Sequence, residues 1–201
     1  MASIYDLKPK FQNLLRPVVS ALAAMGVTAN QITVLAMLLS FVAGSLIYMY
    51  PDQDWPLLAI PVVLFLRMAL NAIDGMLARE HDMKSSLGAI LNELGDVLSD
   101  AALYLPLAVI SDINPTLIVL IVLIAVISEM TGVIAIQIGA QRRYDGPMGK
   151  SDRAFIFGVI GLVLGLGYSS QPWLDYVLIV MLVLLCITVI NRSKCALEEV
   201  K

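Results

Sequence analysis

Two short stretches of this chain bring together side chains that can bind a metal ion and accept a proton. The first stretch is 67–79 and the second is 88–100. On a helix with about 100° per residue, four residues of the first stretch fall within about 60° of one another: Arg67, Asn71, Asp74 and Ala78. The matching arc of the second stretch, about 100° wide, holds Asn92, Glu93, Asp96 and Asp100, with Gly88 at its edge. Carboxylate and amide oxygens that converge from two helices are ligands that hard divalent cations prefer. The two stretches therefore predict a metal-assisted reaction site.

Three small residues accompany the acidic groups: Gly75, Ala78 and Gly88. The lack of bulk beside the carboxylates can let a nucleotide or a diphosphate approach the backbone. The alternative is that these residues only allow membrane helices to pack closely. Both interpretations stay open for each glycine taken singly.

The rest of the chain must hold these groups in a membrane. Hydrophobic residues make up 59% of the 201 residues and charged residues 14%, and the mean hydropathy is +0.86. A soluble domain of this size could not bury so much apolar surface. Runs of about 20 apolar residues predict six membrane spans, at 31–50, 56–78, 88–111, 115–141, 152–170 and 172–191. The predicted fold is an all-α integral membrane protein, with 1–201 forming a single domain.

The basic residues predict the topology. Twelve of the thirteen Lys and Arg residues fall in the N-terminal segment, the second and fourth loops and the tail, and only Arg67 lies inside a span. Basic residues concentrate on the cytoplasmic side, so both termini are expected there, most simply in a bacterial inner membrane. No cleavable signal peptide is expected. The charges of the tail, 192–201, are expected to be solvated and to act only on topology.

Residues 11–25 predict an amphipathic helix that lies in the membrane interface. Its apolar face would hold Phe11, Leu14, Leu15, Val18 and Leu22, with Lys10 and Arg16 directed to lipid phosphates. The alternative is a simple lead-in to the first span. Cys186 and Cys195 lie in or after the last span on the reducing side, so free thiols are expected.

Residues 71–96 resemble the signature of the CDP-alcohol phosphatidyltransferase family, D-x2-D-G-x2-A-R-x8-G-x3-D-x3-D. The chain reads N-AI-D-G-ML-A-R-EHDMKSSL-G-AIL-N-ELG-D and keeps every spacing. Six of the eight fixed positions match, namely Asp74, Gly75, Ala78, Arg79, Gly88 and Asp96. The stretch VTANQIT, 27–33, is similar to the T-P-N-x-x-T opening of the family's first span, with Ala29 in place of proline.

The resemblance implies a membrane transferase of phospholipid biosynthesis. Such an enzyme moves a phosphatidyl group from CDP-diacylglycerol to a water-soluble alcohol and releases CMP, using Mg²⁺ or Mn²⁺. The implied metal ligands are Asn71, Asp74, Asn92 and Asp96, and Asp96 is also the implied base. The implied nucleotide and diphosphate contacts are Thr33, Asp74, Gly75, Ala78, Arg79 and Gly88. A homodimer is likewise implied, and no nucleic-acid partner is expected.

The chain departs from the family pattern at two positions, because residues 71 and 92 are Asn where the signature has Asp. An amide oxygen can bind a hard cation but adds no charge. Three outcomes follow: an enzyme with one metal ion, an enzyme in which Glu93 or Asp100 replaces a lost carboxylate, or a catalytically silent relative that binds CDP-lipids. A small membrane transporter is a further alternative.

Three ionisable residues fall at one depth near the membrane midplane. Counted at about 1.5 Å per residue from the cytoplasmic end of each span, Arg67, Asp100 and Glu129 all lie about 17 to 18 Å deep. An unpaired Arg at that depth is costly. We expect Arg67 to pair with Asp100, Glu129 or both, either to fix helix register or to close the floor of the site.

The fourth loop and the start of the next helix form another basic segment, YDGPMGKSDR, 144–153. Lys150 and Arg153 beside a helix N-terminus suit an anionic group, and Ser151 or Asp152 is a candidate cap. The anion would be the phosphate of an acceptor or the lipid diphosphate, and the resemblance favours a polyol phosphate acceptor. The alternative is a topological signal alone.

Overall fold

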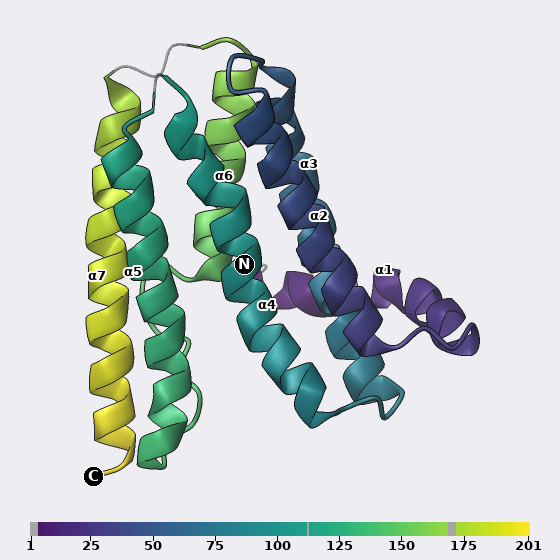
Figure 1. Cartoon of the computed structure of the whole chain (residues 1–201). Coiled ribbons are helices and arrows are strands. Elements are labelled where there is room, and N and C mark those ends of the chain that lie inside the picture. The colour runs from purple at the N-terminus through teal and green to yellow at the C-terminus, as the bar shows by residue number, and fades with distance from the viewer. Residues whose placement is uncertain (1–3, 112, 169–171) are drawn as a thin grey trace. The chain divides into compact units, whose positions relative to one another are not determined.

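The computed structural model describes residues 4–111, 113–168 and 172–201, with side chains from Lys10 onward. This part of the chain is helical and holds no strand (Figure 1). Its elements are α1 (Ile4–Ala24), α2 (Ala29–Met49), α3 (Trp55–Glu80), α4 (Ser86–Tyr104), the 3-10 helix η1 (Leu105–Val109), α5 (Pro115–Ile134), the 3-10 helix η2 (Ala135–Ile138), α6 (Lys150–Gly165) and α7 (Trp173–Glu199).

Helices occupy all six stretches predicted as spans. Four of them are long and apolar enough to cross a membrane: Ala29–Met49, Trp55–Glu80, Pro115–Ile138 and Trp173–Glu199. Helix α4 carries Glu93, Asp96 and Asp100, and α6 has 16 residues, so neither is counted among these spans. The end of the predicted fifth span, 169–170, lies outside the described residues. The described helices therefore identify an all-helical membrane protein, and the total of six spans stays a prediction.

The α-helices in two predicted spans, 88–111 and 115–141, end before the predicted spans do. Helix α4 ends at Tyr104 and η1 follows, because Pro106 has no N–H for the helical hydrogen bond. Helix α5 ends at Ile134, and η2 ends at Ile138, before Gly139, whose φ of 91° is left-handed. The apolar composition continues through both ends, so composition alone could not show where the α-helices stop.

The chain divides into two compact units. Unit 1 consists of Met1–Val42 and Val63–Ser99, and unit 2 consists of Ala43–Val62 and Asp100–Lys201. Helices α2, α3 and α4 each contribute residues to both units. The prediction of a single domain is therefore not decided by this division.

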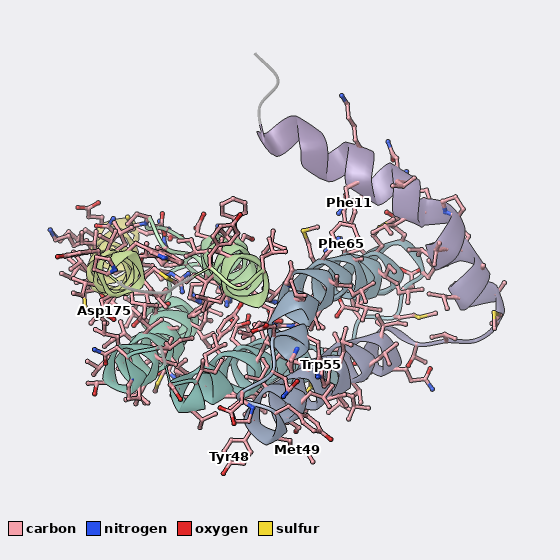
Figure 2. All side chains as sticks on the ribbon, turned by 90° about the horizontal axis from the view of Figure 1, so that it is seen from above. Phe11, Tyr48, Met49, Trp55, Phe65 and Asp175 are labelled. Atoms are coloured by element: carbon pink, nitrogen blue, oxygen red, sulfur yellow. The ribbon has the colours of Figure 1, made fainter. Side chains whose placement is uncertain are left out.

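Unit 1 is built around a core that α1 shares with α2 and α3. Val19 of α1 is fully buried against Ile32 of α2 and Met76 of α3. Helix α1 lies across the other helices of this unit (Figure 1), and the rings of Phe11 and Phe65 meet edge to face with centroids 6.3 Å apart (Figure 2).

The predicted apolar face of α1 is divided between two environments. Leu15 and Leu22 pack against the core of unit 1, whereas Leu14 remains 74% exposed. Arg16 donates to Glu80 at the end of α3, with Nη2 and Oε1 3.0 Å apart. A lipid phosphate is thus not needed to neutralise Arg16, and the interfacial role of α1 stays a prediction.

Unit 2 is organised by α5 and α7, which pack along each other (Figure 1). Ile121 of α5 and Leu185 of α7 are fully buried in its core. Helix α6 approaches the first half of α3 closely, because a Cβ on Gly161 would lie only 2.9 Å from Ile60 Cβ. The apolar core thereby fixes the segments that carry the charged residues of this unit.

Candidate functional site

Side-chain hydrogen bonds set where helices α2 and α4 begin. Thr28 Oγ1 accepts from Gln31 N at 3.3 Å, and Gln31 Oε1 accepts from Thr28 N at 2.9 Å, which forms a capping box before α2. Ser85 Oγ accepts from Gly88 N at 2.9 Å at the start of α4. Asn30 Nδ2 also donates to Ser85 Oγ, at 3.5 Å. The stretch VTANQIT thus connects the beginnings of α2 and α4.

Gly88 makes room for this connection. A Cβ on Gly88 would lie 2.7 Å from Asn30 Oδ1 and 3.0 Å from Ser85 Oγ. The observed neighbours of Gly88 are therefore protein side chains, which supports the packing interpretation. Its predicted contact with a nucleotide stays a prediction, as does that of half-buried Ala78.

Asp74 is the buried acidic residue of this site, with 5% of its surface exposed. Thr33 Oγ1 donates to Asp74 Oδ2 at 2.8 Å, so α2 and α3 are joined at this point. Asn71 Nδ2 donates to Asp96 Oδ1 at 3.4 Å, which joins α3 to α4. The two stretches singled out in the sequence therefore meet. We call Asn71, Asp74 and Asp96 the acidic frame, and Thr33 contacts this frame at Asp74.

Arg79 folds back over the backbone of α3. A Cβ on Gly75 would lie 3.1 Å from Arg79 Nη1, in the space that the guanidinium occupies. The Arg79 side chain is exposed at the last turn of α3. Gly75 thus keeps a guanidinium close to the helix, where it can meet an anionic group.

The donor set suits one hard cation better than two. Within the described residues, no group of three or more His, Cys, Asp or Glu side chains is placed to hold a metal ion. Asp74, half-buried Asp96 and the amide oxygen of Asn71 could supply oxygen ligands from two helices, and the two carboxylates would match the charge of one divalent ion. Asn92 is exposed and Glu93 is half-buried.

Five charged residues of unit 2 form a second group, the arginine cluster: Asp100, Glu129, Arg142, Arg153 and Arg192. Arg153 Nη2 lies 3.0 Å from Asp100 Oδ2 and 3.2 Å from Glu129 Oε1. Glu129 Oε2 lies 3.2 Å from both Arg142 Nη2 and Arg192 Nη1. Asp100 thus pairs with an arginine of its own unit, which weighs against its predicted role as a replacement metal ligand. Asp100 and Glu129, the predicted partners of Arg67, both bind Arg153. Arg67 is buried in unit 1, and its pairing with them stays a prediction.

Arg192 corrects the prediction of a solvated tail. Its side chain is 2% exposed, and Nη1 donates to the carbonyl of Ser128 at 2.6 Å. Helix α7 continues to Glu199, so Arg192 stays on the face that packs against α5. A charge just after an apolar run looked topological, because the sequence does not show that the helix extends beyond the run.

Arg153 lies inside α6 and is almost completely buried, with 1% of its surface exposed. Its Nε and Nη1 atoms have no hydrogen-bond partner among the described residues. The N-cap residue of this helix is Gly149, and Asp152 completes a capping box, since its Oδ2 accepts from Gly149 N at 2.8 Å. Lys150 is half-buried. Unpaired buried donors of this kind are uncommon and favourable for an anion.

The loop 139–149 is fastened to α7. Arg143 contacts Asp145 and Glu199, with 2.7 Å between nitrogen and oxygen in each pair. Met148 N donates to Thr188 Oγ1 at 3.0 Å, and the Asp145 carbonyl accepts from Arg192 Nε at 3.3 Å. Hydrogen bonds from Arg143 lower the pKa of the Asp145 carboxyl.

Both cysteines are free thiols, as predicted.

Comparisons with known proteins agree with this arrangement. Residues 26–192 match the profile of CDP-alcohol phosphatidyltransferases. The inner membrane protein YnbA of Escherichia coli is 45% identical over 195 residues, which is 97% of this chain and 96% of that protein. An archaetidylinositol phosphate synthase of Pyrococcus horikoshii is 29% identical over 102 residues, which is 51% of this chain and 52% of that one.

The fold is also found in solved structures. Phosphatidylinositol phosphate synthase of Mycobacterium tuberculosis, in complex with manganese and citrate, has a TM-score of 0.76 at 19% identity, over 90% of this chain and 87% of that chain. The same enzyme with CDP-DAG bound has a TM-score of 0.71 at 19% identity, over 92% of each chain. The matched profile covers most of the chain, and this protein belongs to the CDP-alcohol phosphatidyltransferase family.

Proposed function

We propose that this protein transfers a phosphatidyl group from CDP-diacylglycerol to an alcohol and releases CMP. The observation that carries the proposal is the contact of Asn71 of α3 with Asp96 of α4 at 3.4 Å, together with Asp74 of α3, which accepts from Thr33 of α2. The spacing of this frame is that of the family to which the chain belongs. The CDP-DAG complex of the mycobacterial enzyme supports the choice of donor.

One divalent cation, Mg²⁺ or Mn²⁺, is proposed to bind at this frame. Its ligands would be Asp74, Asp96 and the amide oxygen of Asn71, with Asn92 and Glu93 on the same helical arc as further candidates. A bound divalent ion would neutralise the charge that builds on the leaving phosphate. The manganese in the mycobacterial structure supports a divalent metal without deciding between the two ions.

Asp96 is the proposed base. Its carboxylate is half-buried and accepts from Asn71, so its position is fixed by a second helix. A carboxylate within reach of the acceptor hydroxyl takes up the proton as the new phosphoester bond forms. Arg79 and the backbone at Gly75 and Gly88 are proposed to bind the nucleotide and the diphosphate.

The acceptor is proposed to be a polyol that carries an anionic group. The supporting observation is the pair of buried Arg153 donors without a partner among the described residues. Lys150, at the first residue of α6, is the second proposed contact. The names of the archaeal and mycobacterial relatives, both synthases of inositol phosphate lipids, are consistent with such an acceptor.

The test is CMP release by the purified protein from CDP-diacylglycerol, with Mg²⁺ or Mn²⁺, against a panel of free, phosphorylated and phosphodiester-linked polyols. Asp96→Asn and the double variant Asn71→Asp with Asn92→Asp are measured in parallel, with Asp52→Asn as the control outside both proposed sites. Metal-dependent release that is lost in Asp96→Asn and kept in Asp52→Asn would establish the transferase. Release that needs no metal, or that survives Asp96→Asn, contradicts the assignment.

A catalytically silent relative is the second candidate, and the two Asn residues favour it because the frame has lost two negative charges. It predicts binding of CDP-diacylglycerol without CMP release. Release from the double variant but not from the natural protein would decide for this candidate.

The remaining proposals concern the setting of the enzyme. The similarity to an inner membrane protein supports an inner membrane location, and we propose six spans with both termini in the cytoplasm. Interfacial binding of α1 and a homodimer complete this proposal.

A further inference from the structure

Thr188 is a fully buried polar residue in the apolar part of α7. Its Oγ1 donates to the Leu184 carbonyl at 2.8 Å, the usual bond of a hydroxyl inside a helix. A hydroxyl oxygen can also accept, and Met148 N donates to Thr188 Oγ1 at 3.0 Å. Met148 is 1% exposed, so this bond lies in the interior of unit 2. One hydroxyl of a membrane helix therefore holds the end of the loop 139–149.

Arg192 contacts the same loop from the next turn of α7. Residues four positions apart lie on one face of a helix, and Arg192 Nε donates to the Asp145 carbonyl at 3.3 Å. Thr188 and Arg192 thus bind two backbone groups of the loop, at residues 148 and 145. We call these two α7 residues the loop anchor.

Gly146 lies between the two bound residues of the loop and allows the close approach. Its φ of 122° is in the region that favours glycine. A Cβ on Gly146 would lie 2.6 Å from Thr188 Cγ2 and 2.7 Å from Thr188 Cα. The loop therefore packs directly against the backbone of α7 at Thr188, and a larger residue at position 146 would push it away.

The loop anchor also fixes where α6 begins. Met148 directly precedes Gly149, the N-cap residue of α6, and the Gly149 carbonyl accepts from Arg153 N at 3.1 Å. Lys150 is the first residue of α6. Both proposed contacts of the acceptor anion, Lys150 and Arg153, thus project from the first turn of a helix whose start is bound to Thr188.

We propose that Thr188 is a positioning residue for the anionic group of the acceptor. Through Met148 it holds the start of α6 in the place where Lys150 and Arg153 bind that group. This inference rests on the proposed function, which supplies the acceptor and its two contacts. A hydroxyl that only stabilises the packing of the loop would change the melting temperature and leave the affinity for the acceptor as it is.

Kinetics of CMP release from CDP-diacylglycerol, with inositol phosphate and glycerol phosphate as acceptors, separate the two roles. Thr188→Val leaves Met148 N without its acceptor, so the acceptor KM should rise about tenfold, with kcat and the KM for CDP-diacylglycerol unchanged. Thr188→Ser keeps the hydroxyl and should keep the natural KM. Ser193→Ala is the control on the same helix, because that hydroxyl donates to the Val189 carbonyl of α7. An unchanged acceptor KM in Thr188→Val, or equal effects of Val and Ser, overturns the proposal.

Gly146→Ala tests the loop anchor from the side of the loop and should raise the acceptor KM in the same way. Gly167→Ala is its matched control, since Gly167 also has a left-handed φ, of 82°, but an added Cβ would have no atom within 4 Å. The control should carry the backbone strain without a change in KM. If Thr188→Val does not fold, these two glycine variants decide, and equal acceptor KM values reject the role of the loop anchor.

Binding of inorganic phosphate distinguishes failure of this inference from failure of the proposed function. It is measured on the purified full-length protein as the concentration that raises the melting temperature half-maximally. Without CMP release from any acceptor the proposed function fails, and the inference then stands only if Thr188→Val weakens phosphate binding about tenfold and Thr188→Ser does not. Equal phosphate binding in both variants, or none in the natural protein, overturns it. Release with free polyols alone overturns the inference while the transferase stands.

Discussion

Single hydrogen bonds decide how the acidic frame of unit 1 is held. Asp74 is buried, and its Oδ2 accepts from the Thr33 hydroxyl of another helix at 2.8 Å. A buried carboxylate that loses such a donor is more costly to keep ionised. Thr33 is thus a positioning residue for Asp74, whereas the motif alone implied that Thr33 contacts the nucleotide.

Thr33→Val tests this role. We expect the thermal stability of the metal-free protein to fall by an amount equivalent to about 1–3 kcal/mol, and CMP release to fall about 10- to 100-fold. Melting temperature and kcat/KM are the two measurements. Thr131→Val is the matched control, because that hydroxyl donates to the Ile127 carbonyl of its own helix. Equal effects of the two variants would contradict the role given to Thr33.

The charged residues of the tail, 192–201, should differ in how much they contribute to stability, because Arg192 is buried and Lys194 is exposed. Removing one member of a buried ion pair costs about 3–5 kcal/mol, so Arg192→Gln should lower the melting temperature strongly. Lys194→Gln, two residues further on the exposed face, should leave it nearly unchanged. If the tail charges acted only on topology, the two variants would have the same melting temperature.

At the scale of elements, close helix packing in unit 2 depends on glycine. A Cβ on Gly161 would lie 2.9 Å from both Ile60 Cβ and the Leu57 carbonyl oxygen. Gly161→Ala should therefore cost about 1–3 kcal/mol of stability through overpacking. The control is Gly149→Ala, whose Cβ would meet only Asp152 Oδ2, at 3.4 Å. The comparison is made by thermal unfolding in one detergent, and a smaller loss for Gly161→Ala would reject the packing argument.

The loop 139–149 gives a pH dependence. Its Asp145 has a lowered pKa in the folded protein because Arg143 donates to it. The stabilisation is therefore present above the unfolded pKa, near 3.9, and is lost as the pH falls through the lower folded value. The melting temperature of the natural protein should exceed that of Asp145→Asn by a small amount near pH 6, and this difference should shrink as the pH falls below the unfolded pKa. Asp52→Asn, in the exposed turn before α3, is measured in parallel as the control for the loss of one carboxylate.

At the scale of the whole molecule, the distribution of basic residues predicts a topology that labelling can check. In a background of Cys186→Ser and Cys195→Ser, Asp52→Cys should react with an impermeant maleimide in intact spheroplasts. Lys84→Cys should react only after the membrane is opened, since its loop is expected in the cytoplasm. The reverse pattern would invert the proposed orientation.

The sequence by itself determined the helical membrane class, a helix in each predicted stretch and the spacing of the motif at 71–96. Apolar length and residue spacing are local properties, and the 3.6-residue period already places Asn71 with Asp74 and Asn92 with Asp96. The spacing also identified the family, because six fixed positions kept their intervals.

The tertiary structure decided which faces meet. Periodicity shows which residues share a face of one helix, and it carries no information about the helix that packs on that face. Thr33 reached Asp74, and Arg142, Arg153 and Arg192 gathered on Glu129, through contacts between residues 13 to 63 positions apart in the chain. The convergence of three arginines on one carboxylate is a property of the folded chain, so only the tertiary structure could reveal it.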